Sequence, residues 1–159
     1  ICGSGIIEVI AEMYLAGIIT TDGVVDGALA ERTQRITADG RTFSFVLHRA
    51  DDPEASDVLV TQNDVRQIQL AKAALYAGIK LLMDEMGVTT VDRIRLAGAF
   101  GSHISVSHAM VLGLIPDCDL EQVTSAGNAA GAGARMALLD RAARVEIAAT
   151  IAKAERIDT

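Results

Sequence analysis

Two glycine turns late in the chain carry the residues best suited to binding a nucleotide. Gly98 and Gly101 follow one short apolar run, Gly127 follows a second, and a helical pattern comes after each turn. Backbone amides at the start of a helix lack partners within the helix and attract anions such as phosphate. Because glycine has no side chain, a ligand can come close to the main chain there. Two such turns side by side favour a nucleotide crevice over the strand ends.

The same residues also admit a purely structural interpretation. Glycine is common at strand-to-helix turns because it lets the two elements pack, and the stretch 96–101 has neither Walker nor dinucleotide-binding spacing. The Gly- and Ala-rich stretch 127–133 is typical of a helix that packs closely against a neighbour. Asn128 is its polar exception: capping the helix is the favoured role, and donation to a ligand is the alternative.

The other reactive side chains predict neither a catalytic residue nor a metal site. His103 and His108 are five residues apart, which places them on different faces of a helix, so we expect polar or capping roles for both. Cys2 and Cys118 have no CxxC spacing and no partner histidine at a recognisable spacing. We therefore expect them to be small buried apolar residues in a protein of the reducing cytoplasm.

The first half of the chain predicts a helix, a β-hairpin and a second, long helix. Apolar residues recur at helical spacing over 6–16, and the alternating runs within 34–47 flank an Asp-Gly turn that predicts a hairpin. A third short strand is expected at 58–60. Thr61 and Asp64 then form a capping-box signature that opens a long helix.

The second half repeats a strand-to-helix unit. Strands are expected at 93–97 and 123–126, and each leads through a glycine turn into a helix, around 106–112 and from about 129 to 140. A last helical pattern covers 145–154. This order of elements predicts an α/β class.

Composition and charge narrow the class of protein. The 159 residues fit one domain, and the formal net charge of −7, with Lys and Arg scattered, argues against a nucleic-acid partner. The apolar run 75–83 is interrupted by Lys80, so no membrane span is expected. The chain starts at Ile1 without a methionine or a signal and passes straight into a patterned helix, so we expect further sequence upstream.

Four separated motifs together resemble one known family. They are 1–7 (ICGSGII), 61–74 (TQNDVRQIQLAKAA), 96–101 (LAGAFG) and 127–134 (GNAAGAGA). In this order they resemble the carboxy-terminal domain of the reductive activators of corrinoid proteins, which belong to the ASKHA superfamily with acetate and sugar kinases, heat-shock chaperones and actin.

The resemblance implies a ribonuclease H-like, actin-like ASKHA lobe. We expect a mixed central sheet with an N-terminal β-hairpin and helices on both faces, as an incomplete part of a larger protein. The expected single C-terminal lobe covers 1–159, with a helical lead-in at 1–32, a β-hairpin and strands at 33–60 and an α/β core at 61–159.

The resemblance also implies an activity and its partners. A reductive activator of this kind uses ATP with Mg to help return a corrinoid from Co(II) to Co(I), and it carries a 2Fe-2S cluster in an N-terminal ferredoxin-like domain. Its partner is a corrinoid protein or a corrinoid-dependent methyltransferase, and a homodimer is possible. Gly98, Ala99, Phe100 and Gly101 match the adenosine motif of the second lobe, and the turn at 127–128 would be its neighbour.

Several groups that the family needs would lie upstream of Ile1. The aspartate-glycine motifs that hold Mg and the β- and γ-phosphates do not occur in these residues, and neither cysteine matches a cluster ligand. Since phosphoryl chemistry depends on positioned charge and metal, we expect no ATP hydrolysis by these 159 residues alone.

Two alternatives stay open at this point. The chain could be a lobe of another ASKHA ATPase or kinase, or of a radical-dehydratase activator. It could also be a non-catalytic interaction or dimerisation module, in which the small-residue face of the long helix at Ala71, Ala74 and Gly78 packs against a partner.

Overall fold

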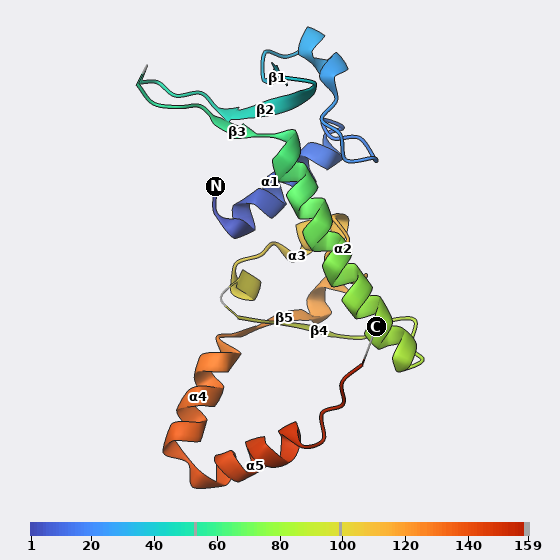
Figure 1. Cartoon of the computed structure of the whole chain (residues 1–159), viewed down its shortest axis with the longest axis vertical. Helices are drawn as coiled ribbons and strands as arrows, with labels where there is room; N and C mark the ends of the chain where they lie inside the picture. Colours follow the sequence, from blue (N-terminus) through green and yellow to red (C-terminus); the bar gives the residue numbers. More distant parts are fainter. Residues whose placement is uncertain (53, 99, 158–159) are drawn as a thin grey trace.

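The computed structural model describes residues 1–52, 54–98 and 100–157. In chain order its elements are α1 (Gly3–Leu15), the 3₁₀ helix η1 (Gly27–Glu31), β1 (Ile36–Asp39), β2 (Thr42–His48), β3 (Val58–Val60), α2 (Gln62–Glu85), β4 (Ile94–Ala97), the 3₁₀ helix η2 (Phe100–Ser102), α3 (Val106–Val111), the 3₁₀ helix η3 (Leu120–Gln122), β5 (Val123–Gly127), α4 (Ala129–Leu139) and α5 (Arg141–Ile151). Figure 1 shows an elongated molecule, with β1–β3 at one end, α4 and α5 at the other, and α2 running along the part between them.

The three strands of the first half form an antiparallel sheet in the order β1-β2-β3. β1 and β2 pair from Ile36 opposite Phe45 to Asp39 opposite Thr42, so the connection is a tight turn that contains Gly40. The hairpin and the third strand predicted from the sequence are therefore confirmed. The Asp-Gly turn sets the register, which in turn decides which side chains face the core.

The main core lies where this sheet, α1 and the start of α2 meet. It consists of Ile10, Met13, Ile19, Val25, Ile36, Val60 and Val65. The side chain of Gln62 is also buried here: its Oε1 accepts from the Val25 amide at 2.8 Å and its Nε2 donates to the Gly23 carbonyl at 2.7 Å. Because both polar ends of the amide have backbone partners, these bonds offset the cost of burying Gln62, which fixes the 23–25 segment against α2.

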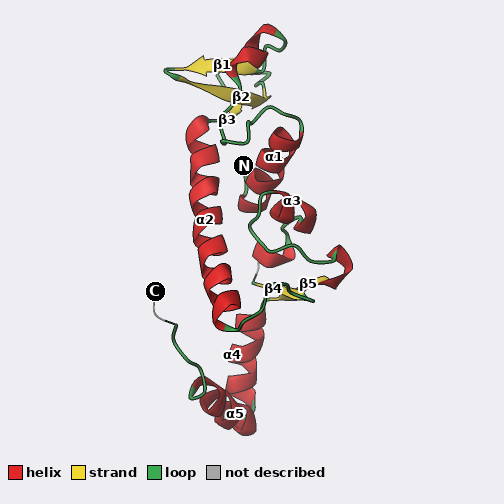
Figure 2. Cartoon of the chain, turned by 90° about the vertical axis from the view of Figure 1, so that its right-hand side faces the viewer, coloured by secondary structure: helices red, strands yellow, loops and turns green. Residues whose placement is uncertain are grey.

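Helix α2 begins as the sequence predicts and then leaves the core. Thr61 Oγ1 accepts from the Asp64 amide at 3.1 Å, and Asp64 Oδ2 accepts from the Thr61 amide at 2.8 Å, which completes the capping box. Only Gln62 and Val65 are buried along its 24 residues. Figure 2 shows α2 running past α1 and α3 toward β4 and β5.

Helix α3 packs against α1. Ile7, Ala109 and Leu114 form a second, smaller buried cluster. Beside it, His108 Nε2 lies 2.7 Å from Glu12 Oε1, and His108 Nδ1 lies 2.6 Å from Ser105 Oγ. His108 thus has the polar role expected of it, because it joins α1 to the start of α3.

The two strands of the second half form their own parallel sheet. β4 pairs with β5 from Ile94 opposite Val123 to Ala97 opposite Gly127. The expected pairing of 93–97 with 123–126 is therefore present. The strands of the described residues lie in two small sheets instead of the one central sheet that was expected, because α2 separates them. This helix of 24 residues carries the chain about 36 Å from β3 toward β4.

Helices α4 and α5 extend away from this small sheet. α3 lies on one side of β4 and β5, and α4 and α5 lie on the other (Figures 1 and 2). None of the α4 side chains is buried, and in α5 only Ala143 is. Within the ranges described above, no helix combines the length and apolar character needed to cross a membrane.

Candidate nucleotide-binding site

The two glycine turns predicted from the sequence lie next to each other at the carboxyl edge of the β4–β5 sheet. Ala97 pairs with Gly127 at the ends of the two strands, and the Gly98 amide donates to the Gly127 carbonyl at 2.8 Å. Gly98 has φ 95° and Gly127 has φ 61°, a backbone region that favours glycine. Parallel pairing thus brings together two turns that are 29 residues apart in the chain.

The glycines differ in the space around them. A Cβ built on Gly98 or Gly127 would meet no other atom within 4 Å, so open space adjoins both turns. A Cβ on Gly101 would lie 2.9 Å from Leu96 Cβ and 3.0 Å from the Leu96 carbonyl carbon. The packing interpretation therefore describes Gly101, whereas Gly98 and Gly127 leave room for a ligand against the main chain.

Two of the amides expected to be free are engaged within the protein. The Gly98 amide bonds to Gly127, as described, and the Gly127 amide donates to Ser125 Oγ at 3.1 Å. The expectation of unpaired amides is wrong at Gly98, because the turn uses that amide to continue the β ladder. Ala99 lies outside the described residues, and so does the side chain of Phe100.

Asn128 has the capping role that the sequence favours. Its Oδ1 accepts from the Gly131 amide at 2.9 Å at the start of α4. The side chain folds back so closely over Gly131 that a Cβ there would lie 2.6 Å from Nδ2. Because capping uses only the oxygen, Nδ2 stays chemically able to donate to a ligand beside the turn.

Two serines join the turns, and the sequence interpretation missed both. Ser102 Oγ donates to the Gly98 carbonyl at 3.2 Å and lies 3.1 Å from Ser125 Oγ. A serine two residues before a glycine is a recognisable signal, because its hydroxyl can bond to the backbone two residues on. The contact between the two serines has no such local signal, since it depends on how β4 and β5 pair.

Neither cysteine belongs to this edge. Cys2 was expected to be buried, but it is exposed and caps α1, where its Sγ accepts from the Gly5 amide at 3.4 Å. The hydrogen bond from Ser4, followed by that from the Gly5 amide, lowers the pKa of the Cys2 thiol below its ordinary value. Cys118 is half-buried. Among the described residues no group of three or more His, Cys, Asp or Glu side chains is arranged to hold a metal ion.

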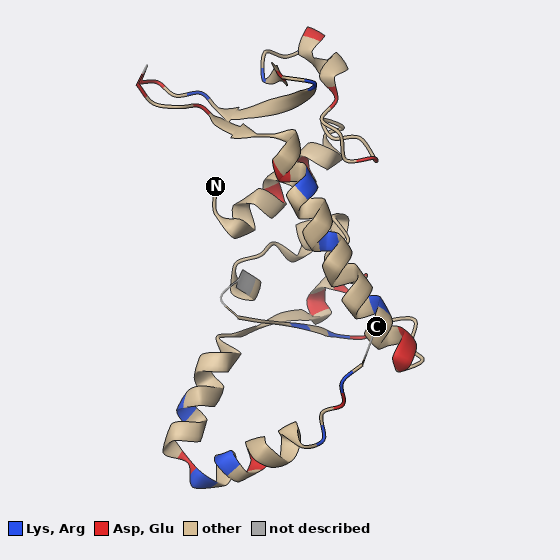
Figure 3. Cartoon of the chain, in the orientation of Figure 1, with Lys and Arg blue, Asp and Glu red and all other residues tan. Residues whose placement is uncertain are grey.

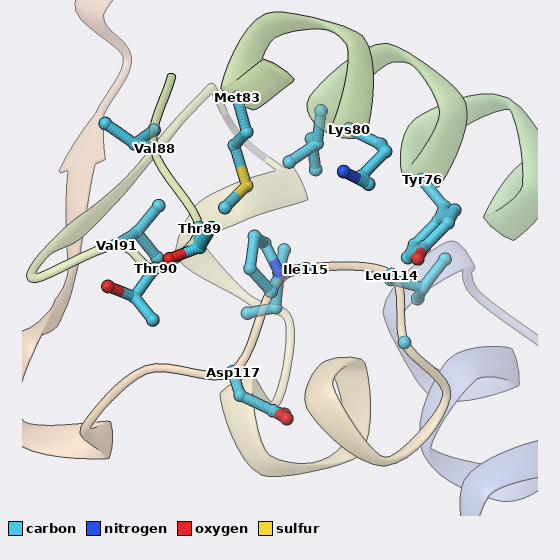
Figure 4. A pocket seen from close by; sticks show the side chains of 13 residues that line it. Tyr76, Lys80, Met83, Val88, Thr89, Thr90, Val91, Leu114, Ile115 and Asp117 are labelled. Carbon is cyan, nitrogen blue, oxygen red and sulfur yellow. The ribbon is translucent and has the colours of Figure 1, made fainter. Parts of the chain in front are cut away.

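A well-formed groove lies elsewhere in the described part of the chain. This groove of about 480 Å³ runs between the second half of α2, the segment before β4 and the segment after α3, with Tyr76, Met83, Val91, Leu114 and Ile115 among its lining residues (Figure 4). The candidate residues 98, 101, 127 and 128 do not line it. The glycine turns instead stand at an open edge. Lys and Arg are spread over α2, β4, α4, α5 and several loops in Figure 3.

A model of the C-terminal domain of RACo, described as the ASKHA domain, matches residues 1–159. The chain belongs to this family. The RACo C-terminal assignment agrees with the α/β architecture and with the resemblance carried by the four sequence motifs. Membership of this family replaces the alternative that the chain is a lobe of another ASKHA ATPase or kinase or of a radical-dehydratase activator.

Two relatives describe the larger context of a RACo C-terminal domain. The chain is 35% identical over 148 residues to the corrinoid activation enzyme RamQ of Eubacterium limosum, covering 88% of this chain and 25% of that protein. It also matches the solved structure of a reductive activator for corrinoid, iron-sulfur protein with a TM-score of 0.84 and 33% identity, over 96% of this chain and 24% of that one. The chain thus spans about a quarter of the length of these relatives.

Proposed function

We propose that these residues form the C-terminal nucleotide-binding lobe of an ATP-dependent reductive activator that returns a corrinoid protein from Co(II) to Co(I). Membership of the RACo C-terminal family and the names of both relatives support this function. The observation that carries the nucleotide part is the parallel pairing of β4 with β5, because it gives one open sheet edge with two adjacent glycine turns.

In this proposal the adenosine end of ATP lies over the turns. The bare main chain at Gly98 and Gly127 lets a flat purine approach, and Asn128 Nδ2 supplies a donor at the rim. Ala99 and Phe100 belong to the proposed contact through the matching motif. Gly101 supports the site from behind, since its missing side chain allows η2 to approach Leu96.

ATP also needs groups that this lobe does not supply. The described residues offer no acidic cluster for Mg and no set of cysteine ligands for iron. We therefore place the phosphate and Mg ligands, and a 2Fe-2S cluster, in the rest of a longer cytoplasmic protein whose single C-terminal lobe is 1–159. Its lead-in, β region and α/β core are 1–32, 33–60 and 61–159.

The role of ATP in this proposal is to shift a conformational equilibrium. Binding energy can favour corrinoid reduction only if ATP binds one arrangement of the lobes better than another. The corrinoid partner, a corrinoid protein or corrinoid-dependent methyltransferase, would recognise that arrangement. The decisive measurement is the extent of Co(I) formation by the full-length protein with and without MgATP, and equal extents would contradict the proposal.

A pair of glycine variants tests the site itself in the full-length protein. Gly127→Val adds a branched side chain in the open space at the turn, and Gly87→Val adds the same side chain at an equally open position, with φ 63° against 61°. Both carry similar backbone strain. We expect only Gly127→Val to weaken MgATP binding, by at least about tenfold, the equivalent of about 1.4 kcal/mol. Equal effects of the two variants would argue against a nucleotide at this edge.

Association is a second candidate role, favoured by the surface of α2. Leu70, Leu75, Tyr76, Leu82 and Met86 are all at least half exposed. The small-residue face that the sequence singles out is exposed too. Apolar patches of this kind commonly mark an interface. Size-exclusion measurements on the 159-residue chain and on the full-length protein separate the cases: self-association of the short chain alone would assign this face to contacts within one subunit, and association of both would support a homodimer.

A further inference from the structure

A closed ring of hydrogen bonds joins the two glycine turns through two serine side chains. The Gly98 amide donates to the Gly127 carbonyl at 2.8 Å on one side of the ring. On the other side, Ser102 Oγ contacts the Gly98 carbonyl at 3.2 Å and Ser125 Oγ at 3.1 Å, and Ser125 Oγ contacts the Gly127 amide at 3.1 Å. Each turn is therefore bound to the other through both its N–H and its C=O.

The protons of this ring have one consistent direction. Ser102 has a single hydroxyl proton and donates it to the Gly98 carbonyl, so at its contact with Ser125 it must accept. Ser125 then donates to Ser102 and accepts from the Gly127 amide. Every donor and acceptor of the relay is used in one sense, and bonds aligned in this way strengthen one another.

The ring lies where the β ladder is irregular. Leu96 pairs with Ser125, but the next residue of β4, Ala97, pairs with Gly127, so Ala126 is an extra residue on β5. Such a bulge interrupts the regular ladder and is common next to functional sites. The serine relay spans the bulge and gives the turns a second connection, beside the ladder bond from the Gly98 amide to the Gly127 carbonyl.

We propose that Ser102 and Ser125 are positioning residues of the nucleotide site. They act through the Gly98 and Gly127 turns, whose relative placement sets the width of the bare main-chain surface on which the purine would lie. This inference rests on the proposed nucleotide-binding function. It adds two residues to the site and assigns a role to the bulge at Ala126, which lies between Ser125 and Gly127.

The test uses MgATP binding to the full-length protein by isothermal titration calorimetry, with the melting temperature measured alongside. Ser102→Ala and Ser125→Ala should each weaken binding about tenfold, raise KM for ATP and leave kcat nearly unchanged, with little change in melting temperature. The double variant should be no weaker than either single one, because the relay is already broken once. Ser102→Thr and Ser125→Thr keep the hydroxyl and should restore binding.

A serine pair outside the site provides the control. Ser105 and Ser107 also lie with their hydroxyls 3.2 Å apart and are outside the two turns, so Ser107→Ala should bind MgATP like the wild type. If the wild type binds MgATP and both alanine variants bind it equally well, the positioning role is wrong while the nucleotide function stands. If the threonine variants bind as poorly as the alanine variants, the hydroxyl relay is also wrong. If the wild type binds no MgATP, both proposals fail.

Discussion

The two ends of this molecule use their side chains in opposite ways. At the hairpin end, β1–β3, α1 and the first turns of α2 enclose a core of seven buried apolar residues and a fully satisfied buried glutamine. At the other end, α4 buries no side chain, and Leu138, Leu139 and Val145 are more than two-thirds exposed. The hairpin end contains its own stabilising contacts, whereas the glycine-turn end presents apolar and polar groups outward. This contrast is expected of a lobe that binds a ligand, or contacts another part of a protein, at its exposed end.

The largest expected effect comes from opening a cavity at the hairpin end. Ile10 is 3% exposed and Leu138 is 76% exposed. Ile10→Ala should lower the free energy of unfolding by about 2–5 kcal/mol, because it removes buried methyl groups and leaves a void. Leu138→Ala should change it by no more than about 0.5 kcal/mol. Urea unfolding of the 159-residue chain measures both, and a comparable loss for the two would remove the contrast between the ends.

Removing the helix cap at each end should show the same contrast, with a smaller effect on the free energy of unfolding. Thr61 caps α2 at the core, and Asn128 caps α4 outside it. Thr61→Ala should lower the global free energy of unfolding by about 1 kcal/mol. Asn128→Ala removes a similar cap, yet we expect its effect to stay within α4, because no buried contact couples that helix to global unfolding.

Amide hydrogen exchange distinguishes a local from a global loss. After Asn128→Ala, the amides of 129–139 should exchange faster while those of α1 and β2 keep their rates. Faster exchange throughout the chain would mean that α4 is coupled to the core after all. Unchanged exchange in α4 would mean that the cap contributes little.

The smallest expected effect concerns the exposed thiol that caps α1. Hydrogen bonds from Ser4 and the Gly5 amide lower the pKa of Cys2, which favours the reactive thiolate. Ser4→Ala removes the larger of the two causes, so the midpoint of the pH dependence of Cys2 alkylation by iodoacetamide should move upward. Replacing Cys118 by Ser in both proteins leaves Cys2 as the only thiol. A midpoint that stays in place or moves downward would contradict this assignment.

Local signals in the sequence predicted much of the fold. The Asp39-Gly40 turn was enough for the hairpin, and Thr61 with Asp64 was enough for the start of α2, because both signals involve residues within a few positions of one another. The strand-to-glycine-to-helix pattern also predicted that the 98 and 127 turns are neighbours. Repetition of one pattern favours parallel strands whose ends share an edge.

What the sequence did not predict depends on contacts between distant residues. Cys2 is exposed and its thiol caps the start of α1, whereas composition alone favoured burial. The division into two sheets follows from the length and path of α2. The bond made by the Gly98 amide and the Ser102–Ser125 contact both depend on the register of β4 against β5 and on its bulge. Shifting β5 by one residue would separate these groups.

Because Asn128 fits closely over Gly131, the two glycines of α4 should respond in opposite ways to replacement by alanine. A Cβ at Gly131 would strike Asn128 Nδ2 at 2.6 Å, while one at Gly133 would meet nothing within 4 Å. Alanine at 133 would therefore stabilise the helix by about 1 kcal/mol, the difference in helix propensity between glycine and alanine. Alanine at 131 would instead push the Asn128 carboxamide away from its position and weaken the cap at the start of α4. A single added methyl group would thus stabilise helix α4 at position 133 and weaken its N-terminal cap at position 131.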